Sequence, residues 1–127
     1  MKQKTYDDLT VILPTYKEEG NIQSMLETLD SLYPGVSIIV ADDNSLDGTP
    51  DLVRAFAADH PRTRLLNRDP DDRGLTASIM EGIVETRTEL FVVMDADFQH
   101  PPESVGGLYD LLAQGADMVV GKREDKN

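Results

Sequence analysis

Three oxygen-bearing side chains occupy every second position just after an apolar run. Asp95, Asp97 and Gln99 follow the five apolar residues at 90–94. If the backbone stays extended here, all three side chains point to one side of the chain. Hard oxygen donors suit Mg²⁺ or Mn²⁺, which keep open positions for phosphate oxygens. The spacing therefore predicts a divalent-cation site, and the alternative interpretation is an ordinary turn followed by a helix cap.

Strands and helices alternate along the chain and must position these side chains. Apolar runs predict strands at residues 9–13, 36–41, 64–66, 90–94 and 117–121. The run at 90–94 contains no alternating polar residue and predicts a strand buried on both faces. Pro14 is expected to end the first strand because proline cannot donate to a strand ladder.

Four helices are predicted between these strands. The first carries apolar residues at helical spacing, Ile22, Met25, Leu26, Leu29 and Leu32. The second is expected to begin with Thr49 as its N-cap and Pro50 in its first turn. The third spans about 75–86, with a stripe formed by Ala77, Met80, Ile83 and Val84, and the fourth spans about 105–112 and ends near Gly115.

This alternation predicts the fold class. Repeated strand–helix units favour an α/β domain, a doubly wound and mostly parallel sheet with helices on both faces, formed by residues 1–127 as a single domain. In such sheets ligands bind beyond the carboxyl ends of the strands, where the strand order reverses. The polar segments 14–19, 42–45 and 95–97 follow three strands, so we expect them to share one crevice.

Composition excludes several classes of function. The 127 residues include no cysteine, which rules out disulfides and thiolate metal sites. Acidic residues outnumber basic ones 24 to 12, and a net charge of −12 disfavours a nucleic-acid partner. No apolar run approaches the roughly 18 residues of a membrane span, and no signal peptide is evident. These features are consistent with the cytoplasm.

The residues expected in the crevice suit a nucleotide. Tyr16 can stack on a base, and the carboxylates of Glu18 and Asp43 can accept hydrogen bonds from base amines or ribose hydroxyls. The alternatives are a half-buried aromatic and, for Glu18 and Glu19, acids that favour the first turn of a helix. Neither usual glycine-rich phosphate loop is present. A bound diphosphate would therefore need a cation to neutralise it.

Four segments together resemble a known family. VILPTYKEEGN, VADDNSLDGT, RGLTASIMEG and MDADFQHPPE are similar, in this order, to the motifs of inverting family 2 glycosyltransferases with the GT-A fold, whose nucleotide-binding half is Rossmann-like. The closest likeness is to the dolichyl-phosphate mannose synthase branch, and it extends over residues 9–123. It implies a metal-dependent transferase that moves a sugar from a nucleotide-diphosphate sugar (GDP-mannose or UDP-glucose) to a polyprenyl phosphate such as dolichyl phosphate.

The resemblance also implies roles for individual residues. The implied nucleotide-sugar contacts are Pro14, Thr15, Tyr16, Glu18, Asp42, Asp43, Arg73, Gly74, Asp95 and Ala96. Asp95, Asp97 and Gln99 would bind Mg²⁺ or Mn²⁺. Asp97 and Arg123 are the implied catalytic residues, with Arg123 near the acceptor phosphate; the alternative for Arg123 is a solvated surface residue.

The two histidines are not expected to act as ligands. His100 should lie on the opposite side of an extended segment from Asp95, Asp97 and Gln99, as a structural or capping residue, and His60 should face solvent.

Other interpretations stay open from the sequence. One is a family 2 transferase that uses a UDP-sugar and a hydroxyl acceptor, and another is a nucleotide-sugar-binding fragment without catalysis. A phospho-receiver domain also repeats strand and helix five times, but its acidic pair follows the first strand. The chain is expected to lack a C-terminal acceptor region through which the full-length protein would meet the cytoplasmic face of a membrane.

Overall fold

The protein is described by a computed structural model covering residues 4–69, 71 and 74–115. The elements in chain order are β1 (Leu9–Thr15), α1 (Ile22–Leu32), β2 (Ser37–Asp42), α2 (Thr49–Asp59), β3 (Thr63–Asn67), α3 (Leu75–Glu85), β4 (Leu90–Val93), the short 3₁₀ helix η1 (Pro102–Ser104) and α4 (Val105–Ala113). Each of the first four predicted strands and all four predicted helices is present. The fifth predicted strand, at 117–121, lies outside the described residues.

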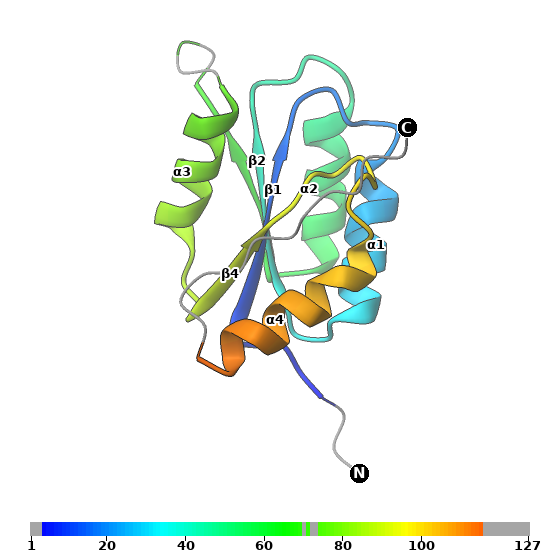
Figure 1. Cartoon of the computed structure of the whole chain (residues 1–127). Coiled ribbons are helices and arrows are strands. Elements are labelled where there is room, and N and C mark those ends of the chain that lie inside the picture. Colours follow the sequence, from blue (N-terminus) through cyan, green and yellow to red (C-terminus); the bar gives the residue numbers. More distant parts are fainter. Residues whose placement is uncertain (1–3, 70, 72–73, 116–127) are drawn as a thin grey trace, which may run out of the picture.

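The described strands form one parallel sheet in the order β3-β2-β1-β4. Helix α3 covers one face, and α1 and α2 cover the other (Figure 1). The prediction of a doubly wound parallel sheet with helices on both faces is therefore confirmed. The strand order changes direction at β1, because β2 and β3 lie on one side of it and β4 lies on the other. Ligands of open α/β sheets bind at such a reversal.

The core lies mainly between the sheet and α1. The predicted stripe of α1 is buried as expected, with Ile22, Met25, Leu26 and Leu29 each fully inaccessible, whereas Leu32 at the helix end is 40% exposed. These side chains pack with the apolar residues of β1 and β2 in one cluster. Full burial of a Leu or Ile side chain contributes about 1.5–3 kcal/mol, so this stripe anchors α1 to the sheet.

Pro14 does not end β1, which continues to Thr15. The carbonyl of Ile12 accepts from the Met94 N–H on the β4 side, and the carbonyl of Thr15 accepts from the Asp43 N–H on the β2 side. Successive residues of a strand bond to alternate sides, so the nitrogen of Pro14 faces the β4 side. Strand β4 has already ended at Val93. The missing N–H therefore breaks no ladder bond between the described strands.

The predicted stripe of α3 is partly wrong. Met80 and Val84 are 55% and 77% exposed, whereas Ser78 and Gly82 are buried. Strand β4 is not buried on both faces either, because Phe91 is 38% exposed. Phe91 alternates with the buried Val92 and so faces the α3 side of the sheet. Helix α3 packs on β1 and β2, so among the described residues it leaves that face of β4 uncovered.

Candidate functional site

The carboxylate of Asp42 joins the ends of β1 and β2. Asp42 is fully buried. Its Oδ1 accepts from the Thr15 hydroxyl and the Ser45 hydroxyl, each at 2.8 Å, and its Oδ2 accepts from the Ser45 N–H at 2.7 Å. A buried carboxyl group is retained only where such hydrogen bonds compensate its lost hydration. Asp42 therefore links the end of β1 to the loop after β2 through hydrogen bonds to Thr15 and Ser45. Its proposed contact with a nucleotide stays a prediction.

The loops after β1 and β2 are joined by backbone donors. The Lys17 N–H donates to the Ser45 hydroxyl at 2.8 Å, and the Glu18 N–H donates to the Thr49 hydroxyl at 2.9 Å. Lys17 adopts a left-handed φ of 57°. These bonds hold loop 16–21 against loop 43–48, so the side chains that both loops carry keep a fixed relation at the sheet edge.

Thr49 does not cap α2 as predicted. It is the first residue of the helix, and Gly48 occupies the N-cap position. Asp47 Oδ1 accepts from the Thr49 N–H at 3.0 Å and from its hydroxyl at 2.6 Å. Burial opposes ionisation of Asp47, but the hydrogen bonds from Thr49 outweigh it and lower the pKa of Asp47. Asp47 lies one residue before the N-cap, and the acidic residue in the first turn of α2, where the helix dipole favours a negative charge, is Asp51.

Asp43 is partly exposed at the carboxyl edge of the sheet and is held on both of its oxygens. Its Oδ1 pairs with Arg68 Nη1 at 2.9 Å, and its Oδ2 accepts from the Gly74 N–H at 3.0 Å. The Asp43 side chain is 15% exposed, whereas that of Arg68 is 1% exposed. Sequence reasoning missed Arg68. A signal was present, because this cation directly follows β3 and so lies at the same edge as the other polar segments.

Residues 95–99 form a turn and are not extended. Residues 96 and 97 are in a turn, Phe98 has a left-handed φ of 64°, and the Gln99 N–H donates to Asp97 Oδ1 at 3.1 Å. Ala96 is buried and Gln99 is exposed. The alignment expected from an extended chain is therefore absent. The segment still begins at the carboxyl end of β4, beside β1, where the strand order reverses.

His100 lies on the same side as Asp95, contrary to the prediction. Its Nδ1 is 3.9 Å from Asp95 Oδ2. This nitrogen is buried and makes no hydrogen bond to any of the described residues. The turn brings His100 back beside the carboxylate, which an extended segment could not do.

The donors on this turn fit a divalent cation. Asp95 and Asp97 supply carboxylates and Gln99 supplies an amide oxygen, the hard ligands that Mg²⁺ and Mn²⁺ take together with phosphate oxygens. Within the described ranges, no group of three or more His, Asp or Glu side chains is arranged so that it could hold a metal ion. Cation binding by Asp95, Asp97 and Gln99 therefore stays a prediction.

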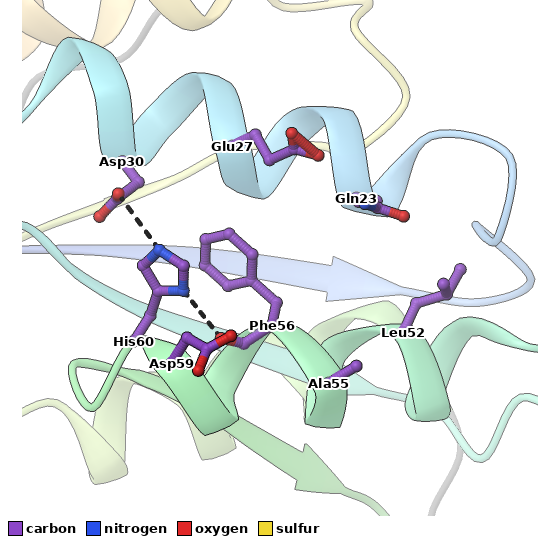
Figure 2. Close-up of a pocket in the computed structure, with 8 residues that line it drawn as sticks. All are labelled: Gln23, Glu27, Asp30, Leu52, Ala55, Phe56, Asp59 and His60. Atoms are coloured by element: carbon purple, nitrogen blue, oxygen red, sulfur yellow. Dashed lines mark hydrogen bonds and ion pairs between the residues drawn. The ribbon is translucent and has the colours of Figure 1, made fainter.

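A separate groove of about 420 Å³ lies between α1 and α2 (Figure 2). It is lined by Gln23, Glu27, Asp30, Leu52, Ala55, Phe56, Asp59 and His60. His60 does not simply face solvent: its ring stacks on Phe56, its Nδ1 lies 2.8 Å from the Phe56 carbonyl, and its Nε2 lies 3.5 Å from Asp30 Oδ2. The groove contains none of the predicted site residues, so the candidate site is the sheet edge.

The sheet brings the predicted segments to one edge. Thr15 pairs in register with Asp42, and β4 runs beside β1, so the segments that follow β1, β2 and β4 emerge together. Tyr16 is 46% exposed at this edge. Arg73 and Arg123 lie outside the described residues. A parallel sheet with acidic and aromatic side chains at its point of reversal defines an α/β domain of the nucleotide-binding class.

The sequence identifies the family within this class. Residues 10–127 match the family model of glycosyl transferase family 2. The chain therefore belongs to that family, which confirms the resemblance drawn from the four motifs.

Individual relatives support this assignment. Dolichol-phosphate mannosyltransferase of Pyrococcus furiosus is 33% identical over 117 residues, which cover 91% of this chain and 33% of the relative. A mannosyltransferase from Pyrobaculum calidifontis, solved with GDP-Man and Mn²⁺, superposes with a TM-score of 0.72 and 29% identity over 84% of this chain and 32% of that one. Glucosyl-3-phosphoglycerate synthase from Mycobacterium tuberculosis, solved with Mn²⁺, UDP and glucosyl-3-phosphoglycerate, gives a TM-score of 0.68 and 27% identity over 84% and 40%.

These likenesses confirm the GT-A glycosyltransferase fold for the described residues. The chain spans about a third of the length of the Pyrococcus relative. None of the helices in the described ranges combines the length and the apolar character that crossing a membrane requires.

Proposed function

We propose that the protein to which this chain belongs transfers a sugar from a nucleoside diphosphate to a polyprenyl phosphate, and that this chain holds the sugar donor. The observation that carries the proposal is the convergence of Tyr16, Asp43 and the Asp95–Asp97 turn at the carboxyl edge, around the reversal between β1 and β4. Family membership and the dolichol-phosphate relative support it.

The donor would lie across the ends of β1 and β2. Tyr16 offers a ring on which a base stacks, and Asp43 offers acceptor lone pairs to base or ribose donors. Further contacts proposed from the family motifs come from Pro14, Thr15, Glu18, Asp42, Arg73, Gly74 and Ala96. Loop 16–21 is hydrogen-bonded to loop 43–48, so the groups on these two loops are held in place before the ligand binds, which reduces the entropy cost of binding.

Asp95, Asp97 and Gln99 would hold Mg²⁺ or Mn²⁺ with the diphosphate. When bound, the cation supplies positive charge that stabilises the departing diphosphate. Both solved relatives contain Mn²⁺, which supports a divalent ion as the cofactor of this proposed function.

The transfer itself needs little acid–base chemistry from the protein. An acceptor phosphate is already ionised, so its oxygen forms a bond to the anomeric carbon without a general base. The bond from that carbon to the diphosphate oxygen breaks, and the nucleoside diphosphate leaves with the electron pair. We propose that Asp97 acts at the diphosphate and that Arg123 lies near the acceptor phosphate. The chain's own residues orient the donor for this in-line attack.

The proposed donor is GDP-mannose, because the Pyrobaculum relative was solved with GDP-Man and the Pyrococcus relative is a mannosyltransferase. A second candidate is a UDP-sugar transferred to a hydroxyl acceptor, since the glucosyl-3-phosphoglycerate synthase was solved with UDP. A polyprenyl phosphate is a lipid, so the proposed site of action is the cytoplasmic face of a membrane. Family membership leaves no support for the phospho-receiver alternative.

A thermal-shift panel tests donor binding by the chain. GDP, UDP and their sugars are added with and without Mn²⁺, because a ligand that binds only the native state raises the melting temperature. We expect a Mn²⁺-dependent rise of a few degrees with GDP and GDP-mannose, and a smaller rise in Asp97→Asn. Asp51→Asn, on the exposed first turn of α2, is the matched control. A panel in which no nucleotide shifts the wild-type chain in either condition contradicts the proposal.

A further inference from the structure

Arg68 is an arginine enclosed almost completely beneath the candidate site. It directly follows β3, and its backbone N–H donates to the carbonyl of Asp42 at 2.9 Å. Its side chain is 1% exposed. Burying a guanidinium is costly unless carboxylates and other acceptors surround it, so its position requires specific partners.

Its partners among the described residues include Asp43 at the site and two residues of α3. Nη1 lies 2.9 Å from Asp43 Oδ1 and donates to the Ser78 hydroxyl at 3.0 Å, and Nε donates to Glu81 Oε2 at 2.7 Å. Ser78 and Glu81 both lie on α3. The planar guanidinium donates in fixed directions, so anchoring it on α3 also fixes the donor that it offers to Asp43.

The Asp43 carboxylate is thereby held from two sides. Arg68 binds Oδ1, and the Gly74 N–H at the start of α3 binds Oδ2 at 3.0 Å. A carboxylate has about four lone-pair directions, and these two bonds use two of them. The remaining directions have a fixed orientation and are available to a ligand's N–H or O–H groups.

We propose that Arg68 is a positioning residue for nucleoside recognition, acting through Asp43. The inference rests on the proposed function, because it takes Asp43 as the group that accepts from the base or ribose of the donor. Arg68 holds that carboxylate in its receiving orientation through the bonds to Asp43, Ser78 and Glu81. The inference therefore assigns its contribution to recognition of the nucleoside.

The chain contains a matched control on the same strand. Arg64 also ties β3 to α3, with Nη2 at 3.0 Å from Glu85 Oε2 and Nη1 donating to the Glu85 carbonyl at 3.1 Å. It lies near the amino end of β3, away from the carboxyl edge. Arg64→Met therefore removes a strand–helix clamp of the same chemistry without touching Asp43.

The test measures affinity for two ligands by titration calorimetry. One is GDP with Mn²⁺, or UDP if the wild-type chain prefers it, and the other is inorganic pyrophosphate with Mn²⁺, which has no nucleoside. We expect Arg68→Met to weaken nucleotide binding about tenfold or more, because Asp43 loses its charged partner. Pyrophosphate affinity should change less than about twofold, and Arg64→Met should leave both affinities near wild type.

A double substitution separates positioning from general stability. In an Asp43→Asn background, Arg68→Met should add little further loss of nucleotide affinity, because residues that act through one another are not additive. If Arg68→Met fails to fold, Arg68→Lys is measured instead; lysine keeps the charge but lacks the planar fork, and it should lose part of the nucleotide affinity only.

Two results overturn the inference while the proposed function stands: nucleotide affinity equal to wild type in the Arg68 variant, or equal losses for nucleotide and pyrophosphate. A wild-type chain that binds pyrophosphate with Mn²⁺ but neither nucleotide overturns both.

Discussion

At the scale of single residues, neighbouring acids at the sheet edge have different surroundings. Asp42 and Asp43 are adjacent in the chain, yet Asp42 is fully buried and the Asp43 side chain is 15% exposed. The difference follows from strand geometry, because successive side chains at the end of β2 point in opposite directions. One carboxylate therefore supports the framework, and the next is available to a ligand.

Asp42→Asn should destabilise the fold. In the wild-type protein both carboxylate oxygens accept hydrogen bonds from buried donors. Asparagine replaces one of these oxygens with an NH₂ group, which cannot accept. At least one buried donor therefore loses its acceptor. We expect a loss of about 1–3 kcal/mol in the free energy of unfolding, measured by urea denaturation. The control Asp51→Asn removes an exposed pair with Arg54 and a negative charge in the first turn of α2, and it should change this free energy by at most about 1 kcal/mol. Equal values for the two variants would contradict the role given to Asp42.

At the scale of elements, small residues set the distance between α3 and the sheet. Gly82 and Ser78 are the buried positions of α3, and a Cβ added at Gly82 would lie 2.6 Å from Cγ2 of Ile12. That methyl belongs to a fully buried, β-branched side chain in β1 and has little room to move. Close packing of α3 also places Ser78 and Glu81 within reach of Arg68.

Gly82→Ala and Gly107→Ala should have opposite effects. Overpacking against Ile12 costs about 1–3 kcal/mol, which exceeds the gain of up to about 1 kcal/mol from replacing a glycine within a helix. Gly107 lies on α4, and a Cβ there meets no atom of the described residues within 4 Å. Gly107→Ala should therefore stabilise the protein by about 0.5–1 kcal/mol. Chemical denaturation of both variants measures this, and a stabilising Gly82→Ala would show that α3 is free to move outward.

At the scale of the whole molecule, a buried tyrosine links the chain's two halves. The Tyr33 hydroxyl, at the end of α1, donates to the Pro102 carbonyl at 2.6 Å and accepts from the Gly106 N–H at 2.9 Å. This contact holds η1 and α4 on the α1 side of the sheet. Because η1 follows the Asp95–Gln99 turn, the same contact fixes where the segment after that turn returns to the fold.

Tyr33 should make stability fall at alkaline pH. Burial raises the pKa of Tyr33 above its ordinary value of 10.0. The unfolded chain then releases the Tyr33 hydroxyl proton at a lower pH than the native protein does. The contribution of this protonated hydroxyl to the free energy of unfolding is therefore complete below pH 10.0 and is lost as pH rises through the native pKa. Urea denaturation between about pH 8 and 11 should show a steeper alkaline decline for wild type than for Tyr33→Phe. If the free energy of unfolding fell equally with pH in both proteins, Tyr33 would not be a source of the alkaline decline.

Local patterns in the sequence determined much of the fold and the position of the candidate site. Helical periodicity located α1 and its buried face, apolar runs located four strands, and the parallel alternation placed residues 14–19, 42–45 and 95–97 at one edge. The helices and strands depend on residues that are close along the chain. The shared edge follows from the rule that ligands of parallel sheets bind beyond the carboxyl ends of the strands. A single sequence is sufficient to apply both arguments.

Tertiary structure alone decided how individual groups are used. Pro14 is tolerated because β4 has ended beside it, Phe91 is exposed because α3 packs on other strands, and His100 returns beside Asp95 because the segment turns at Phe98. Arg68 becomes part of the site through contacts with Asp43 and α3. Each outcome depends on residues that are distant in sequence and adjacent in space, and burial and pairing are properties of that spatial neighbourhood.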